Sequence, residues 1–181
     1  MNLPNKLTLI RIVLVIPFVI VLLTNCLGVA SRPVALVIFV VASITDLLDG
    51  KIARKRNLVT NFGKFMDPLA DKILVTSALV CLMAINPEMM PAWAVIIILA
   101  REFIISGFRL VASDAGIVIA ASMWGKSKTV SHMVMIIMML VAIPWTPYVI
   151  LTKIVMYVAV ILTIISLVDY VWKNRSVIAD M

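Results

Sequence analysis

The chain has 181 residues, of which 64% are hydrophobic and only 14% are charged. Its mean hydropathy of +1.16 lies far above the range of soluble domains and indicates an integral membrane protein. This composition excludes a soluble globular domain. The formal net charge is +7, and we expect the placement of the basic residues to be more informative than their sum.

Six apolar runs have the length of about 20 residues that a helix needs to cross a bilayer. They cover residues 7–27, 34–54, 63–85, 91–113, 125–143 and 147–172. Breakers such as Gly28, Pro87 and Pro144 separate them. We therefore predict an all-α fold: a bundle of six transmembrane helices that forms a single domain over residues 1–181. Because the first run has no small-x-small site after it, we expect it to be retained and not cleaved as a signal peptide.

Most basic residues lie before the first run, in the connection after the second, after the fourth and at the carboxyl end. The other connections hold only Arg32, Glu88 and, a little way into the last run, Lys153. By the positive-inside rule, both termini are predicted to be cytoplasmic. An even number of spans agrees with that orientation.

Several conspicuous residues have simple interpretations. Cys26 and Cys81 each lie in an apolar run without metal-binding neighbours, so we expect both to be packing residues. His132 is expected to be packed or interfacial in preference to contacting a phosphate. The basic stretch KIARKR at 51–56 is short and lacks aromatic residues, so it predicts membrane-flanking charge and no nucleic-acid partner.

The most informative stretch is DLLDGKIARKRNLVTNFGKFMDPLAD, residues 46–71. At about 100° per residue, Asp46 and Asp49 share one stripe of a helix with the small residues Gly50 and Ala53. On the next helix a second stripe holds Gly63, Asp67 and Asp71. Each of two successive helices thus offers a pair of carboxylates on one face.

Four such carboxylates in an apolar chain require compensation. An aspartate at a membrane helix centre costs about 2.5 to 3.5 kcal/mol, so four unpaired ones cost on the order of 10 kcal/mol. Among nearby basic residues only Arg54 lies beside the shared face. Two divalent cations would neutralise the four groups, and all-oxygen ligation favours Mg²⁺, with Mn²⁺ as the alternative. The competing interpretation is that these acids cap helix ends or form solvated pairs.

The spacing of these residues, DxxDGxxARx8GxxxDxxxD, resembles the signature of the CDP-alcohol phosphatidyltransferases. Members of that family exchange the CMP of a CDP-linked lipid for an alcohol with the help of two metal ions. The resemblance implies the following roles. Asp46, Asp49 and Asp67 would bind one metal ion and share the second with Asp71, which would be the catalytic general base. Asp49, Gly50, Ala53, Arg54 and Gly63 would bind the CDP-lipid.

Two further stretches, NLPNKLTLIRIVLVIP at the amino terminus and REFIISGFR at 101–109, resemble the bacterial phosphatidylglycerophosphate synthases within this family. Their acceptor is glycerol 3-phosphate, which needs fixed positive charge beside it. The candidate acceptor-phosphate ligands are polar or basic: Asn5, Thr8, Arg11, Arg101, Arg109, Lys126 and Lys128.

Each of these acceptor ligands has a competing interpretation. Glu102, Ser106 and Arg109 share a helical stripe, and an ion pair that joins helices would explain the charges equally well. Lys126 and Lys128 also suit a topology signal or a lipid-headgroup contact. The segment GKSKT at 125–129 falls where a fifth helix is expected to begin, so its free N–H groups are predicted to lie within reach of a phosphate.

The predicted function is therefore transfer of the phosphatidyl group from CDP-diacylglycerol to glycerol 3-phosphate at the cytoplasmic face of a bacterial plasma membrane. The resemblance also implies a homodimer. One alternative keeps the chemistry with inositol phosphate, serine or a phosphatidyl lipid as acceptor. Another is a cation-coupled transporter, although such proteins usually show internal repeats, and none is visible in this sequence.

Overall fold

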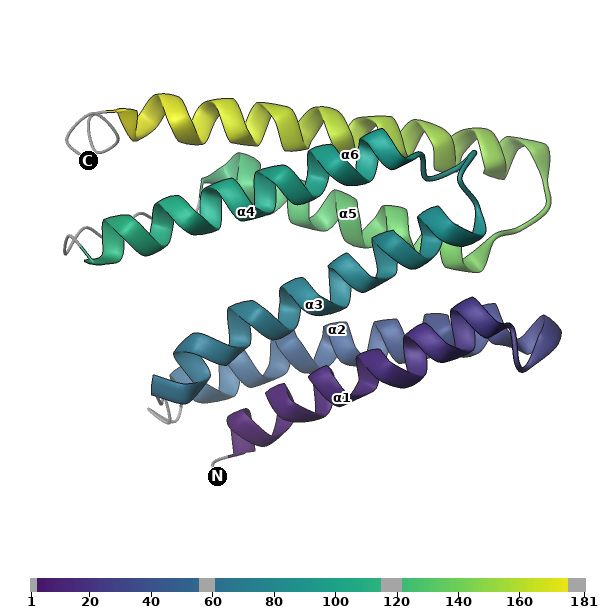
Figure 1. The fold of residues 1–181 in the computed structure, drawn as a ribbon, viewed down its shortest axis with the longest axis horizontal. Coiled ribbons are helices and arrows are strands. Elements are labelled where there is room, and N and C mark those ends of the chain that lie inside the picture. Colours follow the sequence, from purple (N-terminus) through teal and green to yellow (C-terminus); the bar gives the residue numbers. More distant parts are fainter. Residues whose placement is uncertain (1–2, 56–60, 115–121, 176–181) are drawn as a thin grey trace. The chain divides into compact units, whose positions relative to one another are not determined.

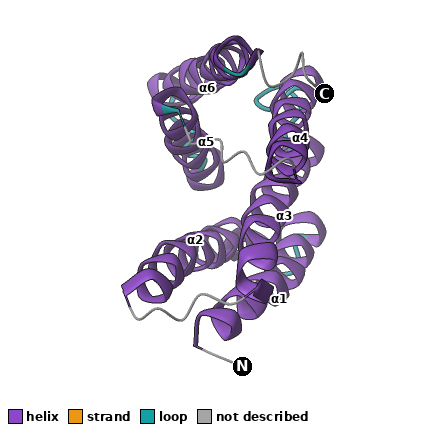
Figure 2. Cartoon of the chain, turned by 90° about the vertical axis from the view of Figure 1, so that its left-hand side faces the viewer, coloured by secondary structure: helices purple, strands orange, loops and turns teal. Residues whose placement is uncertain are grey.

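The computed structural model describes residues 3–55, 61–114 and 122–175 (Figure 1). For residues 3, 4, 46–55, 61–65, 67, 68, 71 and 114 it describes the backbone alone. Within these ranges the chain forms six α-helices and one short 3-10 helix, and no strand (Figure 2). The helices are α1 (Leu3–Thr24), α2 (Ser31–Lys55), α3 (Asn61–Ile85), α4 (Ala92–Asp114), α5 (Met123–Val141) and α6 (Thr146–Lys173). The all-α prediction is confirmed, and every helix boundary lies within four residues of the predicted one.

The turn between α1 and α2 shows why α1 ends before the predicted residue 27. Asn25 and Gly28 both have positive φ, at 50° and 56°, which a right-handed helix cannot include. Gly28 then opens the 3-10 helix Gly28–Ala30. Cys26 lies exposed in this turn, so its predicted packing role is wrong, whereas Cys81 is buried in α3 as expected.

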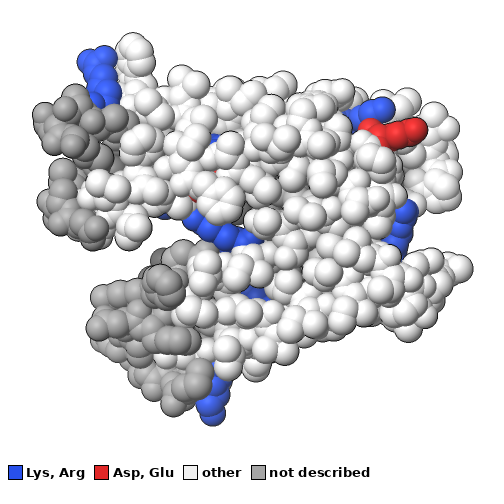
Figure 3. All heavy atoms as spheres, in the orientation of Figure 1, with Lys and Arg blue, Asp and Glu red and all other residues white. Residues whose placement is uncertain are grey.

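Three helical segments of the described chain are long and apolar enough to cross a membrane: Asn5–Thr24, Gly28–Thr45 and Thr146–Lys173. The exposed face of α1 agrees, because it carries the large apolar side chains of Leu9, Val13, Ile16 and Ile20. Figure 3 shows a face of the molecule on which uncharged side chains dominate. Such apolar surfaces suit contact with lipid tails. Membrane crossing by α3, α4 and α5 stays a prediction.

The contacts within the chain group it into two compact units, residues 1–85 and 86–181. In the first unit α1 packs against both α2 and α3. The inner face of α1 presents Val15, Phe18 and Leu22, and the ring of Phe18 lies 6.1 Å from that of Phe39 on α2. These large apolar side chains form the core of the first unit. A single domain over residues 1–181 stays a prediction.

In the second unit α6 packs against both α4 and α5. The inner face of α6 is lined by Thr152, Met156 and Ala159 in its first half, and it carries two fully buried hydroxyls, Thr163 and Ser166, in its second half. At the end of α5, the hydroxyl of Tyr148 donates to the carbonyl oxygen of Met138 at 2.9 Å, which joins α6 to α5. Buried hydroxyls such as those of Thr163 and Ser166 need hydrogen-bonding partners.

Candidate active site

The aspartate signature lies entirely on helical backbone. Asp46, Asp49, Gly50, Ala53 and Arg54 belong to the last turns of α2, and Gly63, Asp67 and Asp71 belong to the first turns of α3. The predicted helical spacing of each acid pair is thus present in the backbone. The side chains of these eight residues lie outside the described part of the chain, so their metal, lipid and catalytic roles stay predictions.

The aspartates of α2 and α3 lie at matching distances from the ends at which the two helices are connected. The two helices run in opposite directions and contact each other (Figure 1). Asp49 lies six residues before the end of α2, and Asp67 lies six residues after the start of α3. Asp46 and Asp71 are nine and ten residues from the same two helix ends. At a rise of 1.5 Å per residue, the acids therefore form two pairs. Asp49 and Asp67 lie about 9 Å from the connected helix ends, and Asp46 and Asp71 lie about 14 Å from them.

The polar face of α1 lies level with these acids. Asn5, Thr8 and Arg11 are buried, with exposed fractions of 7%, 0% and 0%, and each has an interaction partner. They lie 13 to 19 residues before the end of α1, while Asp46 and Asp49 lie 15 and 18 residues after the start of α2. Because α1 and α2 form an antiparallel pair, the buried polar residues of α1 and the acids of α2 occupy the same end of the first unit.

Four carboxylates on neighbouring helices are a donor set that suits two divalent cations, and oxygen-only ligands favour Mg²⁺ over Zn²⁺. Among the side chains that the structure describes, no group of three or more His, Cys, Asp or Glu could hold a metal ion. The acids of α2 and α3 therefore remain the candidate metal ligands of this chain.

The second unit contains a buried ionic cluster, which we call the basic cluster: Arg101, Glu102, Lys128 and Ser166. Arg101 Nη1 donates to Glu102 Oε1 at 3.1 Å, and Lys128 Nζ donates to the same oxygen. Arg101 Nη2 donates to Ser166 Oγ at 2.5 Å. The cluster thus joins α4, α5 and α6. The competing interpretation, an ion pair that connects helices, is what these contacts show; phosphate binding by Arg101 and Lys128 stays a prediction.

The helical positions of the charged residues explain this arrangement. Arg101 is 8% exposed and continues the buried stripe of α4 that includes Ile98 and Ile105. Glu102 lies at the edge of that stripe, where its side chain is 22% exposed. The predicted stripe of Glu102, Ser106 and Arg109 therefore lies beside the buried face of α4 and not on it. Ser106 donates to the carbonyl oxygen of Glu102 in its own helix.

The remaining predicted phosphate ligands lie in different surroundings. Arg109 is exposed, and its guanidinium carbon lies 5.9 Å from the centre of the Tyr170 ring, a cation–π contact. Lys126 is exposed, whereas Lys128, two residues later, is 4% exposed. The two lysines that the sequence places together thus point into different environments.

The start of α5 differs from the prediction. The helix begins at Met123, two residues before GKSKT, because Ser122 caps it: Ser122 Oγ accepts from the N–H of Gly125 at 3.2 Å. The N–H of Lys126 donates to the carbonyl oxygen of Ser122. The sequence predicts that these two N–H groups are available to a phosphate. Both instead donate to Ser122.

His132 is buried, as expected for a packed histidine, with an exposed fraction of 2%. Its Nε2 lies 2.9 Å from Thr163 Oγ1, and that hydroxyl donates to the carbonyl oxygen of Ala159 at 2.7 Å. Since the single hydroxyl hydrogen of Thr163 is used, Nε2 is the donor in the bond to Thr163. This bond fixes α5 to α6 one helical turn beyond Lys128.

Sequence reasoning missed the contribution of α6. Thr163 and Ser166 are both fully buried, and they contact His132 and Arg101. The signal was present, because these hydroxyls recur at helical spacing with Ala159 and Tyr170. The predicted sixth span is so apolar that two small hydroxyl groups did not stand out.

The sequence comparisons agree with the signature. The family model described as "CDP-alcohol phosphatidyltransferase" matches residues 1–165. The chain is 43% identical to a CDP-diacylglycerol–glycerol-3-phosphate 3-phosphatidyltransferase of Bacillus subtilis, covering 96% of this chain and 95% of the relative. It is 39% identical to the enzyme of that name from Rickettsia typhi, covering 93% and 94%, and 36% identical to that from Haemophilus influenzae, covering 99% and 96%. The chain belongs to the CDP-alcohol phosphatidyltransferase family.

Proposed function

We propose that this protein transfers the phosphatidyl group of CDP-diacylglycerol to glycerol 3-phosphate, which gives phosphatidylglycerol phosphate and CMP. The observation that carries the proposal is the complete aspartate signature on α2 and α3, with its acids at matching heights on two contacting helices. The acceptor is chosen because the relatives named above carry glycerol 3-phosphate in their names and match over nearly their whole length.

In this proposal the four aspartates have different roles. Asp46, Asp49 and Asp67 hold one divalent cation and share a second with Asp71, and Mg²⁺ is the preferred ion. Bound cations supply charge stabilisation for the pyrophosphate and for the CMP leaving group. Asp71 accepts the proton of the acceptor hydroxyl, which attacks the phosphorus on the lipid side.

The small residues of the signature make room for the CDP-lipid. Gly50, Ala53 and Gly63 have little or no side chain, so a large polar headgroup can approach the helix backbone. Arg54 is suited to a two-pronged contact with a phosphate, and Asp49 contributes to the same site.

The basic cluster suits the phosphate of the acceptor. Arg101 and Lys128 share one carboxylate, that of Glu102, so their described contacts pair two positive charges with one negative charge. Two basic side chains gathered around one carboxylate are a suitable setting for an anionic ligand. Arg109 and Lys126, and Asn5, Thr8 and Arg11 on α1, complete the proposed set of polar and basic ligands.

The reaction would take place at the cytoplasmic side of a bacterial plasma membrane. The basic residues near both termini and in the connection of α2 to α3 support this orientation through the positive-inside rule. The acyl chains would stay in the bilayer while glycerol 3-phosphate enters from water. Family resemblance supports a homodimer.

The test is an assay of CMP release by the purified protein with CDP-diacylglycerol and Mg²⁺. Glycerol 3-phosphate, inositol phosphate, serine and phosphatidylglycerol are offered one at a time. We expect CMP release with glycerol 3-phosphate and loss of release when a chelator removes the metal. Release with another acceptor alone would correct the substrate, and no release with any acceptor would overturn the proposal.

A further inference from the structure

Ser166 and Glu102 contact different nitrogens of the Arg101 guanidinium. Ser166 Oγ accepts from Nη2 at 2.5 Å, while Glu102 accepts from Nη1 at 3.1 Å. Ser166 is 0% exposed and Arg101 is 8% exposed. A buried hydrogen bond to a charged group contributes more than one at the surface, because water does not replace the lost partner.

Gly125, at the start of α5, leaves room beside Nη2 of Arg101 because it has no side chain. A Cβ atom added to Gly125 would lie 3.6 Å from Arg101 Nη2, 3.7 Å from Ser122 Oγ and 3.9 Å from Ser166 Oγ. The start of α5 therefore lies beside the guanidinium, and a single methyl group added at Gly125 would be in van der Waals contact with Nη2. Arginine has a long side chain with many rotamers, so contacts at both Nη atoms are needed to hold it in one orientation.

One nitrogen of the Arg101 guanidinium makes no hydrogen bond within the described part of the chain. Its Nε is buried, and it has no hydrogen-bond partner among the residues that the structure describes. Burying such a group without a partner costs free energy unless a ligand or water satisfies it. A guanidinium that is held in one orientation suits recognition of a phosphate oxygen.

We infer that Ser166 is a positioning residue for acceptor binding, which acts by fixing the guanidinium of Arg101. This inference rests on the proposed function, in which Arg101 binds the acceptor phosphate. Ser166 itself need not touch the substrate. Its hydroxyl sets the direction in which Arg101 offers its remaining N–H groups, so it determines the affinity for the phosphorylated acceptor and leaves the CDP-lipid side unaffected.

The test compares Ser166→Ala with Ser166→Thr, which keeps the hydroxyl. We expect Ser166→Ala to raise the KM for glycerol 3-phosphate roughly tenfold, equivalent to about 1.4 kcal/mol. The kcat and the KM for CDP-diacylglycerol should stay within about twofold, and Ser166→Thr should restore most of the acceptor affinity. If Ser166→Ala does not fold, Ser166→Cys replaces it, with the same expected direction. An unchanged acceptor KM in a folded variant would overturn the inference.

Thr163→Val provides a matched control. Thr163 is likewise a fully buried residue of α6 with a hydroxyl group, but its partner is His132 and not Arg101. We expect this variant to lose thermal stability while its KM for glycerol 3-phosphate stays unchanged. An equal rise of the acceptor KM in both variants would indicate a general packing effect and would overturn the inference.

Arg101→Gln separates this inference from the proposed function. If Arg101 binds the phosphate, Arg101→Gln raises the acceptor KM, and adding Ser166→Ala to it has little further effect, because the two residues act as a unit. No rise in Arg101→Gln would refute the phosphate role of Arg101. A rise in Arg101→Gln with an undiminished effect of Ser166→Ala in its background would refute only the positioning role.

Discussion

Lys128 on α5 and Arg101 on α4 donate to the same carboxylate oxygen, Oε1 of Glu102. Both basic side chains are nearly buried, whereas the carboxylate keeps 22% of its side-chain surface. One acid thus separates two like charges that would otherwise repel each other in a poorly hydrated site. In the proposed function, stability and binding of the acceptor phosphate therefore depend on the same charged residues.

Replacing Glu102 with Gln should destabilise the protein. The amide keeps the shape of the side chain but removes the negative charge that the two buried cations share, and breaking a buried ion pair costs about 3 kcal/mol or more. We expect a clearly lower thermal unfolding midpoint in detergent. Glu88→Gln is the control, because Glu88 is exposed in the connection before α4.

A double variant tests the electrostatic origin of that loss. Adding Lys128→Met to Glu102→Gln removes one of the two cations and fills its volume with an apolar side chain. Part of the lost thermal stability should return. A midpoint in Glu102→Gln equal to that of the unsubstituted protein would contradict the assigned ion pairs.

Tyr170→Phe should leave the stability unchanged or raise it. The ring of Tyr170 supports the guanidinium of Arg109, but its hydroxyl is buried and has no hydrogen-bond partner in the described part of the chain. Phenylalanine keeps the ring and removes an unsatisfied polar group, whose burial costs about 1 to 3 kcal/mol. Tyr170→Leu, which loses the cation–π contact, should be less stable; thermal denaturation ranks the three proteins, and a destabilised Tyr170→Phe would show that the hydroxyl has a partner.

Asp67→Asn should abolish turnover and leave the protein folded in detergent. An amide is a weaker and neutral metal ligand, and loss of one stabilising group at a reacting phosphate lowers rates on the order of 10² to 10³-fold. CMP release and size-exclusion chromatography measure the two properties separately. Full activity in this variant would contradict the metal assignment, while Glu88→Gln should retain activity.

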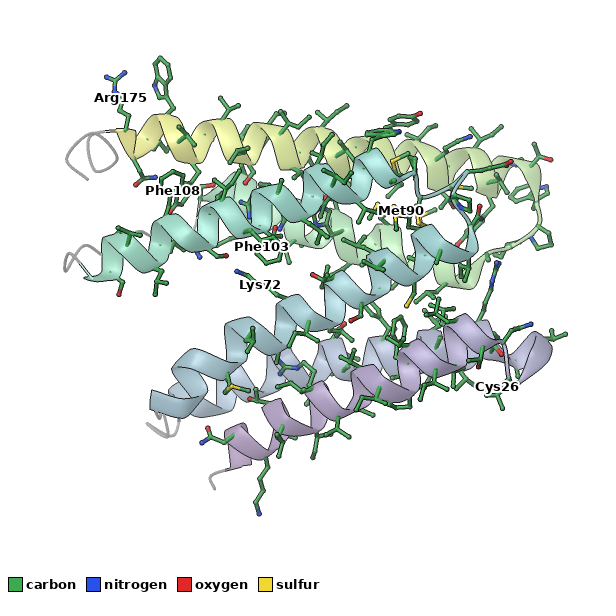
Figure 4. All side chains as sticks on the ribbon, viewed as in Figure 1. Cys26, Lys72, Met90, Phe103, Phe108 and Arg175 are labelled. Atoms are coloured by element: carbon green, nitrogen blue, oxygen red, sulfur yellow. The ribbon has the colours of Figure 1, made fainter. Side chains whose placement is uncertain are left out.

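Cys26 offers a test of the predicted orientation. It is exposed in the connection of α1 to α2 (Figure 4). Cys81, in contrast, is only 2% exposed. If both termini are cytoplasmic, this connection lies on the outer side of the membrane. A membrane-impermeant maleimide should then label intact cells, and Cys26→Ser should remove the label. Labelling that requires permeabilised cells would reverse the orientation.

The sequence alone determined the class of the protein. Apolar runs of membrane-spanning length, separated by glycine and proline, located all six helices to within four residues, because these signals are local along the chain. The aspartate signature also needed no tertiary information. Its spacings of three and four residues fix the face of a helix once the helix is known. The family resemblance that they carry agrees with the family model, which matches residues 1–165.

Only the tertiary structure decided the partners of the charged residues. Glu102 could face any helix from its sequence position, and its pairing with Lys128 depends on how α4 and α5 pack around α6. Ser166 and Thr163 looked like minor interruptions of an apolar helix, yet they bond to Arg101 and His132 from distant parts of the chain. Helical periodicity is set by neighbouring residues, whereas hydrogen bonds across 31 and 65 residues exist only after the helices have packed together.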